Sequence, residues 1–304
     1  MNDRDVRAGT GSIPTPRSLL SRPSSPAALL RQLGLKPRRG LSQSFLTDVG
    51  VTRQIASAAA LTTEDDVLEV GPGLGILTQE LARRVRRVVA FELDRELAAV
   101  LPCLVPENVQ IVQGDALKLE PADYLASPYK LVANLPYQIT SPFLFRYLSI
   151  LPAPSVLVLM VQREVAERIS APPGDLSYLA VAVQSAARPR IVRPVPAGAF
   201  HPRPRVESAV VKLDPLAEPL VPAQQRDDFL ALVRAGFGQP RKQLLNSLEQ
   251  GFAQARSPGW SRDAVRELLE QAGIVVARRP QELRLDEWRT LFEAYRVLRA
   301  DRAG

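Results

Sequence analysis

The sequence predicts an α/β protein with a doubly wound, largely parallel sheet, followed by a small all-helical domain. Short runs rich in β-branched residues alternate with longer amphipathic stretches between residues 67 and 169, a pattern typical of parallel strands joined by helices. A glycine-rich turn separates the first of these strands from the helix after it. Beyond a last strand, Pro215, Pro219 and Pro222 cluster, and only helical patterns follow them.

The first structured element is expected just after residue 24. Residues 1–24 have no periodic apolar pattern, and we interpret them as a disordered N-terminal extension. Ser25 followed by Pro26 is typical of a helix N-cap with proline in the first turn, and Gly34 is expected to end that helix.

The α/β region then divides into regular elements. The strands are expected at Val67–Val70, Val88–Phe91, Val109–Val112, Leu131–Ala133, Val156–Val161 and Glu207–Leu213. The helices between them are expected at Ile76–Arg84, Arg95–Leu101, Ser141–Leu148 and Gln162–Ile169. Ligands of such sheets bind beyond the carboxyl ends of the strands, so the functional site is expected in the loops that follow them.

The proline cluster predicts a domain boundary. We expect an α/β domain over residues 25–215 and a helical domain over residues 216–304. The helices of the second domain are expected at Arg226–Phe237, Arg241–Phe252, Arg262–Ala272 and Leu285–Leu298.

Composition narrows the class of protein. With 39 Lys and Arg against 32 Asp and Glu, the chain favours a polyanionic partner. No apolar run approaches the roughly 18 residues that span a bilayer, so no membrane association is expected. The single cysteine, Cys103, cannot form an intramolecular disulfide, which fits a reducing, cytoplasmic compartment. The chain has one histidine and shows no Cys/His cluster, so no metal is expected, and no protein partner is predicted.

The glycine-rich turn indicates a nucleotide site. Glu69, Gly71, Gly73 and Gly75 form a G-x-G-x-G loop preceded by an acid, which differs from the G-x-G-x-x-G of dinucleotide-binding loops. A carboxylate at Glu69 is unfavourable beside a diphosphate but compatible with a cationic sulfonium. The loop therefore favours S-adenosylmethionine as the cofactor.

Acids after the next two strands point to the same ligand. Glu92 is placed to accept both ribose hydroxyls, and Asp115 is placed to accept the amine of the cofactor's adenine. The alternative is that such acids only cap the following helices, and Asp94 is interpreted as such a cap.

Asn134, Leu135, Pro136 and Tyr137 follow the fourth strand and predict the chemistry. An exocyclic adenine amine is a poor nucleophile, because its lone pair is delocalised into the ring. The side-chain oxygen of Asn134 and the carbonyl of Leu135 would hold its hydrogens, Pro136 would stiffen the turn, and Tyr137 would stack on the base. The target adenine must then be unpaired or flipped out. The alternative is an ordinary strand–turn–helix junction in which Asn134 is an N-cap.

These residues resemble the ribosomal RNA adenine dimethyltransferases of the KsgA type. The resemblance extends from about Leu35 to Leu298 and rests on four motifs: Gln43–Leu46, Glu69–Gly75, Asn134–Tyr137 and Phe200–Ser208. It implies a Rossmann-like S-adenosylmethionine-dependent methyltransferase domain followed by a helical RNA-binding domain.

The resemblance also assigns residues that spacing alone does not. It implies that Gln43, Ser44 and Leu46 join the cofactor site and that Phe200 faces the target base opposite Tyr137. The family usually has asparagine where this chain has Ser44, whose shorter side chain suggests cofactor contact through its backbone or through water.

Two basic segments are expected to contact RNA. The chain between residues 188 and 212 is basic, and it is predicted to grip phosphates beside Phe200, with Arg203 and Arg205 nearest to it. The alternative is a solvated charged face. A second segment, Gly238–Leu248, resembles the corresponding family segment, so Arg241 and Lys242 are expected to contact RNA.

The resulting hypothesis is dimethylation of the N6 amines of two adjacent adenines near the 3′ end of small-subunit ribosomal RNA, in a pre-30S particle. The residues themselves indicate adenine-amine methylation, and the resemblance supplies the RNA. Alternatives are a resistance-type methylase of large-subunit RNA, a non-catalytic RNA-binding or transcription-associated protein, and methylation of DNA adenine or a protein amide.

Overall fold

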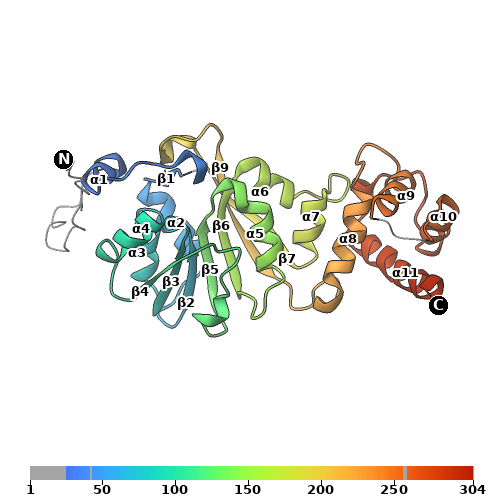
Figure 1. Ribbon diagram of the computed structural model, residues 1–304, viewed down its shortest axis with the longest axis horizontal. Coiled ribbons are helices and arrows are strands. Elements are labelled where there is room, and N and C mark those ends of the chain that lie inside the picture. Colours follow the sequence, from blue (N-terminus) through green and yellow to red (C-terminus); the bar gives the residue numbers. More distant parts are fainter. Residues whose placement is uncertain (1–24, 42, 256–258, 304) are drawn as a thin grey trace, which may run out of the picture.

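The computed structural model describes residues 25–41, 43–255 and 259–303. The expected disordered extension, residues 1–24, and Ser42 lie outside the described residues. The molecule is elongated, with the sheet and its helices in one part and helices α8 to α11 at the C-terminal end (Figure 1).

A seven-stranded sheet in the order β4-β3-β2-β5-β6-β9-β7 forms the centre of the described chain. Neighbouring strands from β4 to β6 are parallel, and β9 is antiparallel to both β6 and β7. The strands are β2 (Asp66–Val70), β3 (Arg87–Glu92), β4 (Val109–Gln113), β5 (Lys130–Asn134), β6 (Val156–Gln162), β7 (Ala187–Val195) and β9 (Ser208–Pro215). The strand order reverses between β2 and β5, where open α/β sheets bind their ligands.

Helices cover both faces of the sheet, as predicted. Val67 packs with α2 (Val49–Ala58) and α3 (Ile76–Ala82), whereas Leu68 packs with α5 (Thr140–Tyr147), α6 (Arg163–Ile169) and α7 (Tyr178–Gln184). Successive strand side chains point to opposite faces, so the strands covered on both sides carry apolar residues on both faces. The short helix α4 (Arg95–Val100) contacts β3 and β4.

The N-terminal segment reaches the sheet through a second, small pairing. Helix α1 (Pro26–Gln32) begins as predicted, with the Ser25 hydroxyl accepting a hydrogen bond from Ala28 N at 3.3 Å. Gly34, with φ +68°, follows its end. Strand β1 (Phe45–Leu46) then pairs antiparallel with β8 (Phe200–His201).

Besides the two-residue strands β1 and β8, one strand and two α-helices of the described chain were not predicted from the sequence. Strand β7 contains Pro189 and Pro194, which argue against a strand interior, but β7 is the edge strand and needs hydrogen bonds on one side only. Helices α2 and α7 begin at side-chain caps from Asp48 and Ser177. In the sequence, each of these two helices is marked only by an N-cap residue, without a proline in the first turn or a long apolar repeat.

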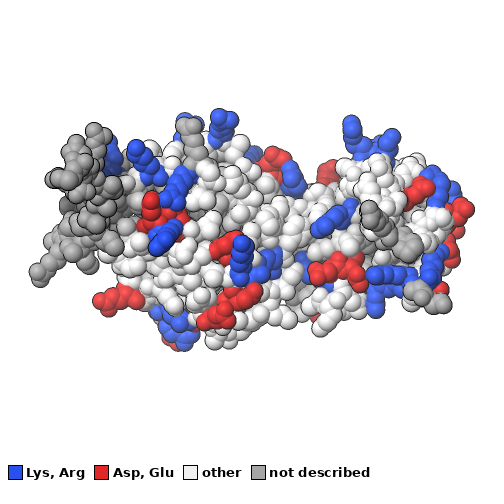
Figure 2. Space-filling model, viewed as in Figure 1, with Lys and Arg blue, Asp and Glu red and all other residues white. Residues whose placement is uncertain are grey.

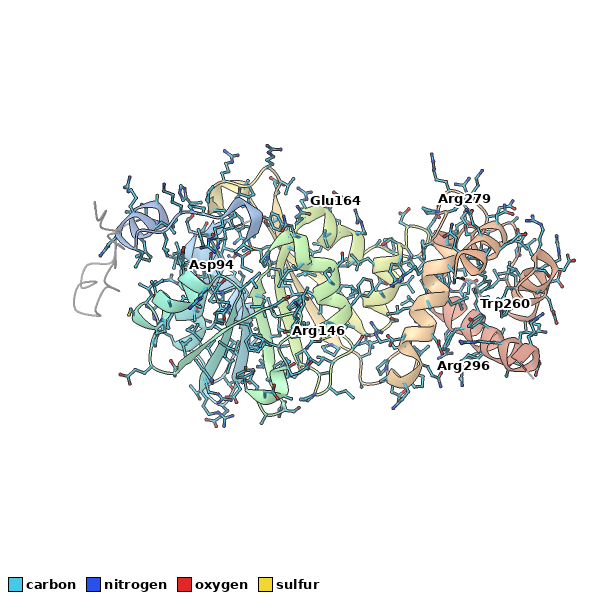
Figure 3. The ribbon with its side chains drawn as sticks, in the orientation of Figure 1. Asp94, Arg146, Glu164, Trp260, Arg279 and Arg296 are labelled. Carbon is cyan, nitrogen blue, oxygen red and sulfur yellow. The ribbon has the colours of Figure 1, made fainter. Side chains whose placement is uncertain are left out.

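The C-terminal helices form their own core. They are α8 (Arg226–Gly236), α9 (Leu244–Gln254), α10 (Arg262–Gln271) and α11 (Leu285–Ala303). Helix α11 contributes the fully buried Trp288 to this core. Trp260 lies among these helices (Figure 3) and stacks on Tyr295 with ring centroids 5.0 Å apart. The same apolar cluster includes Ala180 of α7, so the helical bundle also packs on the α/β part. Among the described residues, no helix combines the length and apolar character needed to cross a membrane.

The start of α9 differs from the prediction. The helix begins at Leu244, so Arg241 and Lys242 lie in the turn before it rather than in its first turn. Both side chains remain exposed there.

Candidate active site

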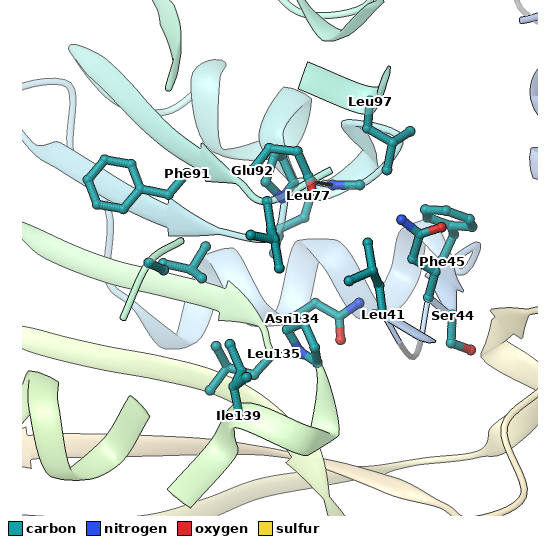
Figure 4. A pocket seen from close by; sticks show the side chains of 18 of the residues that line it. Leu41, Ser44, Phe45, Leu77, Phe91, Glu92, Leu97, Asn134, Leu135 and Ile139 are labelled. Carbon is teal, nitrogen blue, oxygen red and sulfur yellow. Dashed lines mark hydrogen bonds between the residues drawn. The ribbon is translucent and has the colours of Figure 1, made fainter. Parts of the chain in front are cut away.

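One pocket at the carboxyl ends of β2, β3 and β5 brings together most of the residues that the sequence predicts for the site. The residues from the predicted set that line it are Gln43, Ser44, Leu46, Gly71, Gly73, Glu92, Asp115, Asn134, Leu135, Pro136, Tyr137 and Phe200. Glu92 and Asn134 reach it from the ends of β3 and β5 (Figure 4). Glu69 does not line the pocket.

The glycine loop leaves one side of this pocket open. Gly71 and Gly73 have φ of +72° and +58°, a backbone region that favours glycine. A Cβ on Gly73 would lie 3.0 Å from Cδ1 of Phe45. The backbone conformation therefore favours glycine at this position, and a Cβ would also crowd the Phe45 ring.

Glu92 is a buried acceptor at the pocket wall. Its carboxylate accepts hydrogen bonds from Asp94 N at 2.8 Å and Gly73 N at 3.2 Å, and the residue is 6% exposed. Burial raises the pKa of Glu92 to about 7, and the charge of Asp94 acts in the same direction. Glu92 therefore joins the glycine loop to the loop after β3, with an acceptor directed at the pocket.

Glu69 lies within β2 and is only 1% exposed. Its Oε2 has no hydrogen-bond partner among the described residues. Burial raises the pKa of Glu69 to about 8, and the nearby charge of Glu92 raises it further. This carboxyl is a buried group behind the glycine loop rather than part of the pocket wall.

Gln43 joins the N-terminal segment to the loop after β3. Its Nε2 donates to Oδ2 of Asp94 at 2.8 Å, and its Oε1 accepts from Arg38 N at 2.8 Å. Asp94 also caps α4 through Oδ1, which accepts from Glu96 N at 2.9 Å, as expected. Both polar ends of the Gln43 side chain are thus used to hold the chain beside the pocket.

Ser44, which departs from the family pattern, bonds the N-terminal segment to the chain that follows β8. Its hydroxyl donates to the carbonyl of Pro202 at 2.5 Å. This bond continues the β1–β8 pairing, in which Phe45 opposes His201 and Leu46 opposes Phe200. The Ser44 side chain therefore holds the Phe200–Ser208 segment.

Asp115 lines the pocket and also stabilises its own turn. Its Oδ1 accepts from Leu117 N at 2.9 Å. A turn rather than a helix follows Asp115, so the alternative that it caps a helix does not describe it. The bond within the turn uses one carboxylate oxygen.

The Asn134–Tyr137 loop is fixed between β5 and α5. Leu135 N donates to Met160 O at 3.1 Å, and a 3₁₀ turn from Tyr137 to Ile139 follows. Helix α5 starts at Thr140 with Ile139 as its N-cap, so the alternative that Asn134 is merely an N-cap is wrong. Asn134 instead lies at the pocket, at the end of β5.

Two aromatic residues line the same pocket. The Tyr137 hydroxyl lies 2.7 Å from the hydroxyl of Ser208, and burial raises the pKa of Tyr137. Phe200 is 5% exposed. The sequence placed Ser208 at the end of a motif but gave it no role. Only the pairing of β9 with β6 and β7 brings Ser208 to Tyr137.

The basic segment between residues 188 and 212 is not one patch beside Phe200, contrary to expectation. Arg188 opposes Asp214 in the sheet, whereas Val195 opposes Ser208, so Arg188 lies roughly 20 Å farther along the strand. Lys212 pairs with Asp214 at 3.1 Å.

The exposed Arg203 and Arg205 do lie on the segment next to Phe200, between β8 and β9. Basic side chains project from that edge of the molecule, and the rest of the visible face mixes both signs of charge (Figure 2). Among the described residues, no cluster of His, Cys, Asp and Glu is suited to hold a metal ion.

Comparisons with known proteins agree with this geometry. The family model for ribosomal RNA adenine dimethylase matches residues 34–272. The chain is 44% identical over 265 residues to Ribosomal RNA small subunit methyltransferase A of Dehalococcoides mccartyi, covering 86% of this chain and 89% of that protein. It is 42% identical to the protein of the same name from Moorella thermoacetica, covering 88% and 96% of the two chains.

Solved structures show the same fold. The chain is similar to a dimethyladenosine transferase from Plasmodium falciparum, with a TM-score of 0.68 and 25% identity over 84% of this chain and 98% of that one. It is also similar to the 23S rRNA methyltransferase ErmE, with a TM-score of 0.61 and 30% identity over 82% and 98% of the two chains. The fold is therefore the Rossmann-like methyltransferase fold with C-terminal helices. On the extent of the family match and the identity to its relatives, this chain belongs to the ribosomal RNA adenine dimethylase family.

Proposed function

We propose that this chain transfers methyl groups from S-adenosylmethionine to the N6 amines of two adjacent adenines near the 3′ end of small-subunit ribosomal RNA. The substrate is proposed to be RNA within a pre-30S particle in the cytoplasm. The observation that carries the proposal is the placement of Asn134, Tyr137 and Glu92 around one pocket at the reversal of strand order. The names of the relatives support the small subunit as the source of the RNA.

The pocket residues fit the proposed cofactor. Glu92 offers a buried carboxylate to ribose hydroxyls, and the open backbone at Gly71 and Gly73 admits close approach of a ligand. Glu69 lies behind the glycine loop and does not line the pocket, and burial raises its pKa to about 8, so we assign it a supporting position rather than a direct cofactor contact. We assign Asp115 to the adenine amine of the cofactor, and Gln43, Ser44 and Leu46 to the wall that covers it.

The catalytic arrangement positions the amine without a strong base. The Asn134 side-chain oxygen and the Leu135 carbonyl accept the two N6 hydrogens, which turns the nitrogen lone pair toward the methyl donor. Tyr137 and Phe200 hold the flipped base between them. When bound, S-adenosylmethionine supplies a methyl carbon to which nitrogen bonds as the C–S bond breaks, sulfur keeps the electron pair, and an N6 proton leaves to water.

RNA contacts are proposed on both parts of the chain. Arg203 and Arg205 would hold phosphates beside the target base, and Arg241 and Lys242 would extend the contact to the helical part. This assigns methyl transfer to residues 25–215 and additional RNA binding to residues 216–304.

The second candidate function is methylation of large-subunit RNA, which the likeness to the 23S rRNA methyltransferase ErmE favours. Radiolabelled methyl transfer to isolated small and large subunits from cells that lack the enzyme, followed by nucleoside analysis, separates the two. We expect N6,N6-dimethyladenosine in small subunits only. Label confined to large subunits would reverse the assignment, and absence of label in both would favour a non-catalytic protein. Competition with DNA tests the remaining acceptor class.

A further inference from the structure

The Phe200–Ser208 segment reaches the pocket at one end and the pocket residue Tyr137 at the other. Phe200, at one end, lines the pocket and pairs with Leu46 in the β1–β8 ladder. Ser208, at the other end, is fully buried at the start of β9, opposite Gln162 on one side and Val195 on the other. The backbone of Ser208 is therefore fixed by strands on both sides.

The segment between these ends is also held. The Ser44 hydroxyl donates to Pro202 O, and Arg163 N donates to Glu207 O at 3.0 Å. The Glu207 carboxylate pairs with the Arg163 guanidinium at 2.9 Å. These contacts hold the segment near both of its ends, at Pro202 and at Glu207.

The Ser208 hydroxyl connects this segment to Tyr137, an aromatic residue of the pocket wall. Its Oγ lies 2.7 Å from the Tyr137 hydroxyl. Tyr137 belongs to the loop after β5, and its ring orientation depends on two side-chain torsions that backbone pairing does not fix. The hydroxyl pair is the described contact that ties the far end of this ring to the sheet.

We propose that Ser208 is a positioning residue that fixes the orientation of the Tyr137 ring at the pocket wall, and that the second methyl transfer to each adenine depends on it more than the first. This inference rests on the proposed function. Ser208 acts through Tyr137 and does not contact the base itself.

The difference between the two transfers follows from the count of amine hydrogens. An unmethylated amine offers two hydrogens to Asn134 and the Leu135 carbonyl, whereas a monomethylated amine offers one. With one hydrogen bond fewer, the aromatic walls must supply more of the orientation that the reaction requires. A ring that is free to turn therefore slows the second transfer more.

The test compares Ser208→Ala, Ser208→Thr, Tyr137→Phe and the Ser208→Ala/Tyr137→Phe double variant in single-turnover methyl transfer to small subunits. Monomethyl- and dimethyladenosine are measured separately. Ser208→Ala and Tyr137→Phe are each expected to slow the second transfer by roughly three- to tenfold, the effect of one hydrogen bond, and to let monomethyladenosine accumulate. Ser208→Thr is expected to restore the wild-type ratio, because it keeps the hydroxyl.

The double variant tests whether the two residues act as a pair. Its effect is expected to equal that of either single variant, because both remove the same bond. Ser155→Ala is the control, since its hydroxyl bonds Tyr129 O far from the pocket, and it should leave the product ratio unchanged. Calorimetric affinity for S-adenosylhomocysteine and the Tm should stay near the wild-type values.

A wild-type product ratio in Ser208→Ala, or effects that multiply in the double variant, would overturn the inference. If Ser208→Ala does not fold, Tyr137→Phe removes the same bond from the other side, and its product ratio decides. Failure of the wild-type protein to dimethylate small subunits would instead refute the proposed function, so the two failures are distinguishable.

Discussion

Gln43 Nε2 donates a 2.8 Å hydrogen bond to Asp94 Oδ2, and this bond fastens the N-terminal segment to the loop after β3. Arg38 adds a second link, with its guanidinium 2.9 Å from the Glu96 carboxylate. The wall of the pocket contributed by Leu41 and residues 43–46 therefore depends on a contact between residues 51 positions apart. Weakening the Gln43–Asp94 hydrogen bond should therefore lower the affinity for the cofactor.

We predict that Gln43→Glu weakens cofactor binding by about tenfold or more, because a carboxylate there repels Asp94 and removes a hydrogen bond worth roughly 1.5–3 kcal/mol to a charged group. Calorimetry with S-adenosylhomocysteine measures the effect. Gln110→Glu, on the exposed side of β4, introduces the same charge away from this pair and should bind normally. Equal affinities in the two variants would show that Gln43 does not hold the wall.

Asn134→Ala is expected to reduce kcat by roughly 10²–10³-fold, the usual effect of removing one positioned polar group from an active site. Cofactor affinity should remain largely intact, because Glu92 and the glycine loop are unchanged. Single-turnover kinetics and calorimetry separate the two effects. Gln110→Ala is the matched amide control. Full activity in Asn134→Ala would refute the assigned role.

Cofactor affinity should fall as pH decreases below about 7. Burial raises the pKa of Glu92 to about 7, so the cofactor-free site takes up a proton below that pH. Ribose hydroxyls favour the charged carboxylate, so binding releases this proton, and affinity at pH 6 should be about tenfold lower than at pH 8. Glu92→Gln should bind more weakly but lose this pH dependence. If the affinity of the wild-type protein does not change between pH 6 and pH 8, the assignment is contradicted.

The same carboxyls affect the stability of the cofactor-free protein. The pKa values of Glu69 and Glu92 are raised above the ordinary 4.5, to about 8 and about 7. Between pH 4.5 and 8 the unfolded chain therefore holds fewer protons than the folded chain. The contribution of these two groups to the free energy of unfolding should thus decrease as pH rises through that window. Denaturant titrations of the wild type and Glu69→Gln measure this.

Reversing the charge of Arg203 and Arg205 together should weaken RNA binding and flatten its salt dependence. Removing the interaction with one phosphate is expected to reduce the slope of log K against log salt by roughly 0.7–0.9. Arg188→Glu with Arg190→Glu is the matched control, because these exposed residues lie toward the opposite end of β7. If the control pair weakens binding equally, net charge rather than the segment beside Phe200 determines affinity.

Arg226 connects the helical bundle to the α/β part, and its removal should destabilise the protein. Its guanidinium donates to Ser149 Oγ at 2.8 Å, Ser185 Oγ at 3.2 Å and Ala182 O at 2.8 Å, and the residue is 5% exposed. Arg226→Ala should cost about 2–4 kcal/mol of unfolding free energy, because buried polar groups would be left without partners. Chemical denaturation measures the change. The exposed Arg289→Ala should change stability by less than about 0.5 kcal/mol.

The parallel half of the sheet could be predicted because its strands are apolar on both faces. Val67 and Leu68 pack on opposite layers of helices, so an uninterrupted apolar run marks the strand without any knowledge of its neighbours. Pro189 and Pro194 concealed β7, because a sequence does not reveal which strand lies at the edge.

Glu92, Asp115 and Asn134 could be predicted because each carries chemistry that its position after a strand explains, whereas Gln43, Ser44, Leu46 and Phe200 were expected only from the family resemblance. The contacts that orient them could not. Tyr137 meets Ser208 across 71 positions, and Ser44 meets Pro202 across 158, so both depend on strand register. Register also separated Arg188 from Phe200, although the two are close in sequence.

The edge strand β7 is poorly suited to pair with a strand of another molecule. Proline has no amide hydrogen, so Pro189 and Pro194 interrupt the row of donors along the outer side of β7. A bulge between Ile191 and Arg193 disturbs that side further, and exposed arginines accompany it. Another β-strand cannot easily extend the sheet there, and self-association through this rim is disfavoured.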